Sequence, residues 1–174
     1  MKKFLVALLT TVLVASMVAC GGKNDVTTET TNAPAEEEIV SDGTLGQDLL
    51  VVFAEHLKAN PEATTQELAD AVITNEKILF SGGSMPVEPG FLMGFSADIT
   101  GFEEAVSFMP MIGTIPFMGY VFSLAEGADV DAFIATLETN ADPRWNICTE
   151  AEQTVIKAVG NKVFFLMCPK SLEG

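Results

Sequence analysis

Basic residues are scarce in this chain. It has 9 Lys and Arg against 24 Asp and Glu, which gives a formal net charge of -15. Residues 40–174 alone have six basic and nineteen acidic residues, a net charge of -13. Proteins that bind nucleic acids need a basic surface against the phosphate backbone, so this composition predicts no nucleic-acid partner. The net negative charge also disfavours a domain that lies flat on an anionic leaflet. It is explained either by solubility or by the binding of a basic partner.

Residues of common catalytic and metal sites are also few. The only histidine is His56, and there are three cysteines. A Ser-His-Asp triad would have to use His56, and a zinc site would need more His or Cys. The sequence contains no GxGxxG, Walker or HExxH motif. The stretch Ser81-Gly82-Gly83-Ser84 lacks the lysine of a phosphate loop and indicates a turn. We therefore predict no catalytic residue, metal ligand or cofactor.

Two pairs of acidic residues are better explained by their positions on expected helices than by acid–base catalysis. Glu103 and Glu104 are adjacent on an expected short helix, so their side chains would point in different directions. Asp129 is placed to cap the next helix and Asp131 to lie in its first turn, where negative charge is favourable. The sequence after Asp131 lacks the later ligands of a calcium loop.

The amino terminus has the pattern of a signal peptide. Lys2 and Lys3 precede an apolar run over residues 4–18, interrupted only by Thr10, Thr11 and Ser16. This run is shorter than the roughly 20 residues that span a ~30 Å hydrocarbon core. Small Ala19 precedes Cys20, as a cleavage site requires. We predict a signal peptide over residues 1–19. The alternatives are an ordinary secreted protein or a single anchoring helix.

The stretch Met17-Val18-Ala19-Cys20-Gly21 resembles the lipobox of bacterial lipoproteins, although the usual first residue of that motif is leucine. The resemblance implies cleavage before Cys20 and acyl chains such as palmitate on that cysteine. About two chains are needed for stable anchoring, because one chain binds a membrane only marginally. The protein is then expected on the outer face of the cytoplasmic membrane, or on an outer-membrane leaflet if the cell has two membranes.

A change of composition separates this anchor from the remainder. Residues 20–41 are rich in threonine and contain the acidic run Glu36-Glu37-Glu38, without any aromatic residue. Such a segment buries too little apolar surface to offset the entropy of ordering it. We predict a disordered linker, with docking of a basic partner as the less favoured alternative. Residues 42–174 have the usual length of a single domain.

Helices are indicated by capping boxes and apolar spacing. The pairs Thr44 with Gln47, Thr64 with Glu67, and Thr100 with Glu103 each fit a capping box. Leu45, Leu49, Phe53 and Leu57 continue the first pattern, which stops at Asn60-Pro61. The clearest helix follows Asp129, with the apolar residues Val130, Phe133, Ile134 and Leu137. We expect four helices, of which the one after Thr100 is short.

Strands are indicated mainly in the second half. Residues 117–124 and the shorter stretch 91–95 are rich in residues that favour strands. Residues 155–159 and 163–167 flank Gly160-Asn161, a two-residue hairpin signal. A rival is a short helix that begins at Thr149 and ends at Gly160. This order predicts the α+β class, with an antiparallel sheet of about four strands and helices packed on one face.

The carboxyl-terminal third, from about Gly119 to Pro169, contains Gly119-Tyr120-Val121-Phe122, the helix after Asp129, Trp145-Asn146-Ile147-Cys148 and the hairpin at Gly160-Asn161. By these features it resembles small uncharacterised lipoproteins of clostridia-type bacteria. It implies an exported α+β domain of unknown activity and assigns no catalytic residue.

Residues 85–120 interleave glycine and proline with methionine and phenylalanine. Methionine beside aromatic residues packs adaptably, both in cores and at promiscuous binding surfaces. The segment therefore predicts either a loop folded into the core or an apolar binding surface formed by Phe108, Met109, Met111 and Phe117. Methionine also binds Cu(I), but no His or Cys adjoins these residues.

Cys148 and Cys168 are the cysteines that remain once Cys20 is acylated. An even pair in an exported domain is compatible with a disulfide. The hairpin register places Cys168 opposite Gln153, so the chain must fold back near Thr149 to bring the two Cα atoms within ~7 Å. Two free buried thiols are the alternative.

The sequence thus favours a membrane-tethered binding or interaction domain of the cell envelope, with an envelope protein or an apolar ligand as partner. The alternatives are a carboxylate-based hydrolase of envelope polymers and a structural or assembly role. The sequence does not specify an oligomeric state.

Replacing Cys20 tests the anchor directly. Cys20→Ser should block lipid attachment and leave precursor or released soluble protein, because serine has no thiol to acylate. Fractionation of cells that express either chain measures this. Salt-resistant membrane retention of the variant, equal to that of the unaltered chain, would contradict the lipoprotein hypothesis.

Overall fold

The computed structural model describes residues 39–112 and 114–172. The elements follow the order α1 (Leu45–Ala59), α2 (Thr65–Ile73), β1 (Gly82–Val87), β2 (Glu104–Pro110), β3 (Met118–Ser123), α3 (Val130–Asn140), β4 (Gln153–Val159) and β5 (Lys162–Cys168). The strands form one antiparallel sheet in the order β1-β2-β3-β5-β4. The predicted α+β class is confirmed, with five strands where about four were expected.

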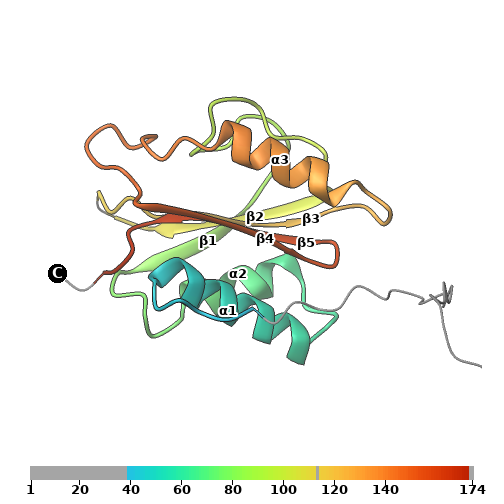
Figure 1. Cartoon of the computed structure of the whole chain (residues 1–174), viewed down its shortest axis with the longest axis horizontal. Helices are drawn as coiled ribbons and strands as arrows, with labels where there is room; N and C mark the ends of the chain where they lie inside the picture. The colour runs from blue at the N-terminus through green and yellow to red at the C-terminus, as the bar shows by residue number, and fades with distance from the viewer. Residues whose placement is uncertain (1–38, 113, 173–174) are drawn as a thin grey trace, which may run out of the picture. The chain divides into compact units, whose positions relative to one another are not determined.

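The helices cover both faces of the sheet (Figure 1). Helices α1 and α2 lie on one face, and α3 lies on the other together with the segment that joins β1 to β2. The expectation of helices on one face was therefore wrong. The reason is that β3 is buried along its whole length, so both faces of the sheet require a cover.

Alternate residues of the central strands belong to two separate cores. Val121 and Phe164 pack under α1 and α2, and the rings of Phe164 and Phe53 of α1 lie 5.3 Å apart between centroids, tilted by 38°. Phe122 and Phe165 face the other way and pack under α3 and the β1–β2 segment. This alternation follows from the two-residue period of a strand.

Helix α2 begins with the predicted capping box. The Thr64 hydroxyl accepts a hydrogen bond from the Glu67 N–H, and the Glu67 carboxylate accepts one from the Thr64 N–H. The hydrogen bonds that the Thr64 N–H and the Thr64 hydroxyl donate to the Glu67 carboxylate lower the pKa of Glu67 below its ordinary value. The box at Thr44 does not form, because the Thr44 hydroxyl donates to Asp42 at 2.7 Å instead.

The short helix predicted from the third capping box, at Thr100, is not formed, so that prediction was wrong. The Glu103 N–H donates to the Ser123 carbonyl, and Glu104 begins β2. There is no helix here among the described residues, because pairing with β3 satisfies the backbone in its place. The expected strand at 91–95 is also absent and contributes only an isolated bridge between Phe95 and Ala141.

Glycines 82 and 83 begin the edge strand β1, where the sequence indicated a turn. Pro86 lies in the same strand, a position that an edge strand tolerates because one side makes no ladder hydrogen bonds. Gly119 has a packing role: the ring of Phe108 lies directly over it, where any side chain would collide. Phe108 thereby reaches the core under α1 and α2.

The hairpin of β4 and β5 is confirmed. Val159 pairs with Lys162 across the two-residue turn Gly160-Asn161, and Gly160 has a φ of 61°. This left-handed conformation favours glycine. The rival helix after Thr149 is not formed.

Phe133 is the first residue to test in the packing of α3. It is 6% exposed and contacts the ring of Phe122 at 5.2 Å between centroids. Phe133→Ala should lower the free energy of unfolding by about 3 kcal/mol or more, because it removes apolar contact and leaves a cavity. Phe91→Ala is the control, since Phe91 is 75% exposed and its loss should change stability by less than ~0.5 kcal/mol. Denaturant titration measures both, and equal effects would contradict this packing.

Candidate functional site

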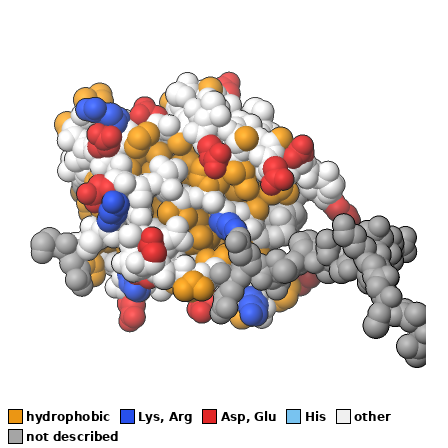
Figure 2. Space-filling model, in the orientation of Figure 1, with side chains coloured by type: hydrophobic (Ala, Val, Ile, Leu, Met, Phe, Trp, Pro, Cys, Tyr) orange, Lys and Arg blue, Asp and Glu red, His pale blue; other side chains and the backbone are white. Residues whose placement is uncertain are grey.

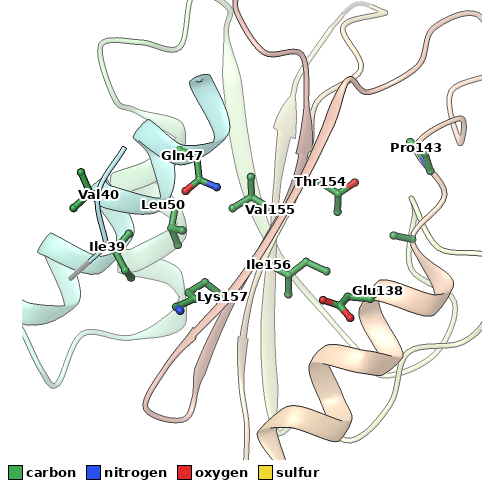
Figure 3. A pocket seen from close by; sticks show the side chains of 11 residues that line it. Ile39, Val40, Gln47, Leu50, Glu138, Pro143, Thr154, Val155, Ile156 and Lys157 are labelled. Atoms are coloured by element: carbon green, nitrogen blue, oxygen red, sulfur yellow. The ribbon is translucent and has the colours of Figure 1, made fainter. Parts of the chain in front are cut away.

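A groove of about 610 Å³ follows the outer edge of β4. Strand β4 is the last in the sheet, with α1 beside one face and α3 beside the other, so the groove lies between the two layers (Figure 3). Hydrophobic side chains gather across the middle of this side of the molecule, with charged groups around them (Figure 2).

The groove has two walls, because successive residues of β4 point to opposite faces of the sheet. Val155 and Lys157 lie on the α1 side, and Thr154 and Ile156 lie on the α3 side (Figure 3). The α1 wall is completed by Ile39, Val40, Gln47 and Leu50, and the α3 wall by Glu138, Ala141 and Pro143. Each wall combines apolar side chains with polar groups, and polar atoms present the larger share of the lining surface.

The floor of the groove is a strand edge. Strand β4 pairs with β5 on one side only, and no described strand pairs with its other side. Every second residue of an edge strand directs its N–H and C=O away from the sheet. The opposite edge, β1, contains Pro86, which has no N–H to offer a further strand. Strand β4 contains no proline and is thus the better template for pairing.

The sequence left two alternatives for residues 85–120, a loop folded into the core or a binding surface at Phe108, Met109, Met111 and Phe117. For Phe108 and Phe117 the core alternative holds, and the binding surface was wrong. Phe108 and Phe117 are buried at 0% and 2% exposure in the core under α1 and α2. Met109 is half-buried and Met111 is exposed. The periodicity of β2 places Phe108 inward, and this was missed because residues 104–110 had not been predicted as a strand.

Both cysteines of the described region are free thiols. Cys148 is exposed on the loop before β4, whereas Cys168 is buried at the end of β5. The candidate disulfide is therefore not formed, and only Cys168 behaves as a small buried hydrophobe. Burial raises the pKa of the Cys168 thiol to about 12.

A polar cluster lies at the opposite end of the sheet, between the core and the first turn of α2. The Lys162 ammonium donates to Ser123 Oγ at 3.0 Å and to Thr65 Oγ1 at 3.4 Å. The Thr65 hydroxyl donates in turn to the Glu104 carboxylate at 2.8 Å. A serine beside a lysine suggests a nucleophile and its base, but neither pocket described in the structure includes these residues. The cluster instead satisfies two buried hydroxyls.

The other residues considered for catalysis or metal binding, His56 and Asp129, lie on or at the start of helices. His56 is half-buried on α1, and Asp129 caps α3 by accepting from the Ala132 N–H at 2.9 Å. Among the described residues there is no group of three or more His, Cys, Asp or Glu that could hold a metal ion. Glu138 is the only carboxylate among the described residues that line the groove, so the two facing carboxylates of a glycoside hydrolase are not found there.

Comparisons with protein-family models, with curated proteins and with solved structures found no match. No helix within residues 39–112 and 114–172 is long and apolar enough to cross a membrane. The predicted signal peptide, Cys20 and nearly all of the predicted linker lie outside the described residues.

The two thiols should differ sharply in reactivity. In a chain with Cys20→Ser, a maleimide should modify Cys148 quickly at neutral pH and should leave Cys168 unmodified until the protein is denatured. The thiolate is the nucleophile, and burial both hides Cys168 and keeps it protonated. Mass spectrometry of tryptic peptides measures the labelling. Equal labelling in the native state, or a linked Cys148–Cys168 peptide, would contradict this arrangement.

Proposed function

We propose that the chain is a membrane-tethered extracytoplasmic lipoprotein whose folded part binds an extended segment of another envelope protein along β4. The observation that carries the proposal is the groove whose floor is a sheet edge with which no strand of the described residues pairs. The tether is supported by the sequence at residues 1–20.

Strand addition fits this groove physically. An extended peptide can pair with the outward N–H and C=O groups of β4, which gives affinity with little dependence on sequence. Its alternate side chains would then enter the α1 wall and the α3 wall. Val40, which is 70% exposed, offers apolar contact on one side, and Ile156 and Ala141 offer it on the other.

The charges indicate which segments are preferred. The chain carries a net charge of -15, and Glu138 stands exposed on the α3 wall. Complementary charge speeds encounter and disfavours wrong partners. A segment with alternating apolar residues and at least one basic residue facing α3 therefore suits the site best.

A small apolar ligand is a weaker candidate for this groove. Ligand pockets usually enclose most of the surface of the bound molecule. This groove follows the open edge of the sheet, and Gln47, Thr154 and Lys157 add polar groups to its lining. A long extended ligand matches that shape better than a compact one.

Peptide selection tests the proposal. Displayed random peptides selected on the mature Cys20→Ser chain should be enriched in alternating apolar and basic residues. On binding a selected peptide, the outward-facing amide groups among residues 154–158 should gain protection from hydrogen exchange, measured by NMR. Protection confined to other strands, or a selection without enrichment, would contradict strand addition at β4.

Two variants sharpen this test. Glu138→Gln changes an exposed side chain and should weaken binding of a basic peptide several-fold without altering the fold. Ile156→Asp should weaken binding at least ~10-fold by placing a charge on the apolar wall. Met85→Asp is the matched control, because Met85 is 50% exposed on the other edge strand.

A further inference from the structure

The two most exposed large apolar side chains of the described region lie on adjoining loops. Ile112 is 88% exposed and follows β2, and Ile147 is 94% exposed and precedes β4. The loops are joined at the Thr114 carbonyl, which accepts from Thr149 Oγ1 at 3.0 Å and from Asn146 Nδ2 at 3.4 Å. Both isoleucines thus project from one end of the sheet.

Two further apolar side chains lie at this end. Leu79 and Met111 are each 63% exposed, and the Met111 N–H donates to the Ser81 carbonyl at 2.9 Å, which brings their two segments together. Leu79, Met111, Ile112 and Ile147 are named here the loop-end patch. Half of the eight large apolar side chains that are exposed in the described region belong to it.

The form of the patch distinguishes it from the groove. Its members project from loop tips, and neither pocket described in the structure includes any of them. A folded partner needs a complementary rigid surface, whereas the fluid boundary between headgroups and acyl chains accommodates projecting apolar groups of any arrangement. Residues 111–117 contain no charged residue that would have to be desolvated.

Two basic side chains near the patch in the sequence lie beside acidic partners. Lys77 pairs with Asp48 at 2.6 Å, and Arg144 lies 3.7 Å from Glu150. Paired in this way, Lys77 and Arg144 form no basic surface that would draw this end to anionic lipid. The net charge of -15 adds a general repulsion from an anionic leaflet. Contact with a membrane here would have to come from burial of apolar area.

We propose that the loop-end patch inserts into the interface of the membrane to which the chain is tethered, with Ile112 and Ile147 as the inserting side chains. The acidic remainder of the surface is then turned away from the leaflet. This proposal rests on the proposed location at a membrane, but it depends neither on lipid at Cys20 nor on the groove along β4. It gives the tethered domain a defined orientation.

Trp145, the only tryptophan of the chain, reports on the contact. It lies two residues before Ile147 and is half-buried against the core under α3. Adding phosphatidylcholine vesicles to the mature Cys20→Ser chain should shift its emission to the blue, and brominated acyl chains should quench it. The absence of both changes would overturn the proposal.

The double variant Ile112→Asn with Ile147→Asn should weaken partitioning into these vesicles about tenfold or more, because both inserting side chains become polar. Phe91→Asn is the matched control: Phe91 is 75% exposed on the segment between β1 and β2 and should leave partitioning unchanged. Circular dichroism checks that each variant is folded. Equal partitioning of the double variant and the unaltered chain would overturn the proposal.

Salt separates an apolar contact from an electrostatic one. With phosphatidylglycerol vesicles, raising the ionic strength from about 0.01 M to about 0.15 M shortens the screening length from ~30 Å to ~8 Å. Partitioning should increase, because the repulsion between the acidic chain and the anionic leaflet is screened. A decrease would indicate electrostatic attraction and would overturn the proposal. If the unaltered chain proves to carry no lipid on Cys20 while the Cys20→Ser chain still binds vesicles, the tether is refuted and the loop-end patch is supported.

Discussion

Burial of both faces of β3 and β5 is the constraint on which the rest of this structure depends. Phe122 and Phe165 point to one face, and Val121 and Phe164 point to the other, and all four are fully buried. A sheet whose central strands are apolar on both sides must be covered on both sides. The placement of α1 and α2 on one face and α3 on the other follows from this requirement.

Because helices cover both faces of the sheet, the sheet itself is accessible mainly at its two edge strands and at the loops that join its strands. At the β4 margin the helices of the two outer layers stand apart from the strand edge, and the groove forms between them. At the β1 margin Pro86 limits further pairing. The ends of the strands carry the loops, and at one end these loops expose Ile112 and Ile147. The proposed peptide site and the proposed membrane contact thus use different margins of the same sheet.

The polar groups inside this arrangement are matched to partners. Thr65 and Ser123 are buried, and both hydroxyls accept hydrogen bonds from the Lys162 ammonium. The Thr65 hydroxyl in turn donates to the Glu104 carboxylate. The Tyr120 hydroxyl donates to the Met93 carbonyl at 2.8 Å and thereby holds the β1–β2 segment over the sheet. Such contacts satisfy buried groups that would otherwise destabilise the fold.

Local patterns in the sequence were sufficient for several elements. The apolar spacing from Leu45 to Leu57 determined α1, Asp129 determined the start of α3, and Gly160-Asn161 determined the last hairpin, because each signal acts within a few residues. Local patterns did not predict strands β1 and β2. Gly82 and Gly83 by themselves favour a turn, and Thr100 with Glu103 favours a helix start. Pairing between strands gives the backbone in these regions different hydrogen bonds, so that strands form in place of the turn and the helix.

The exposure of Ile112 and Ile147, the burial of Phe108 and Phe117, and the groove along β4 were likewise decided only by tertiary structure. Each of these properties depends on residues distant in the chain, whereas the charge, the scarcity of histidine and the predicted lipid anchor are properties of the sequence alone.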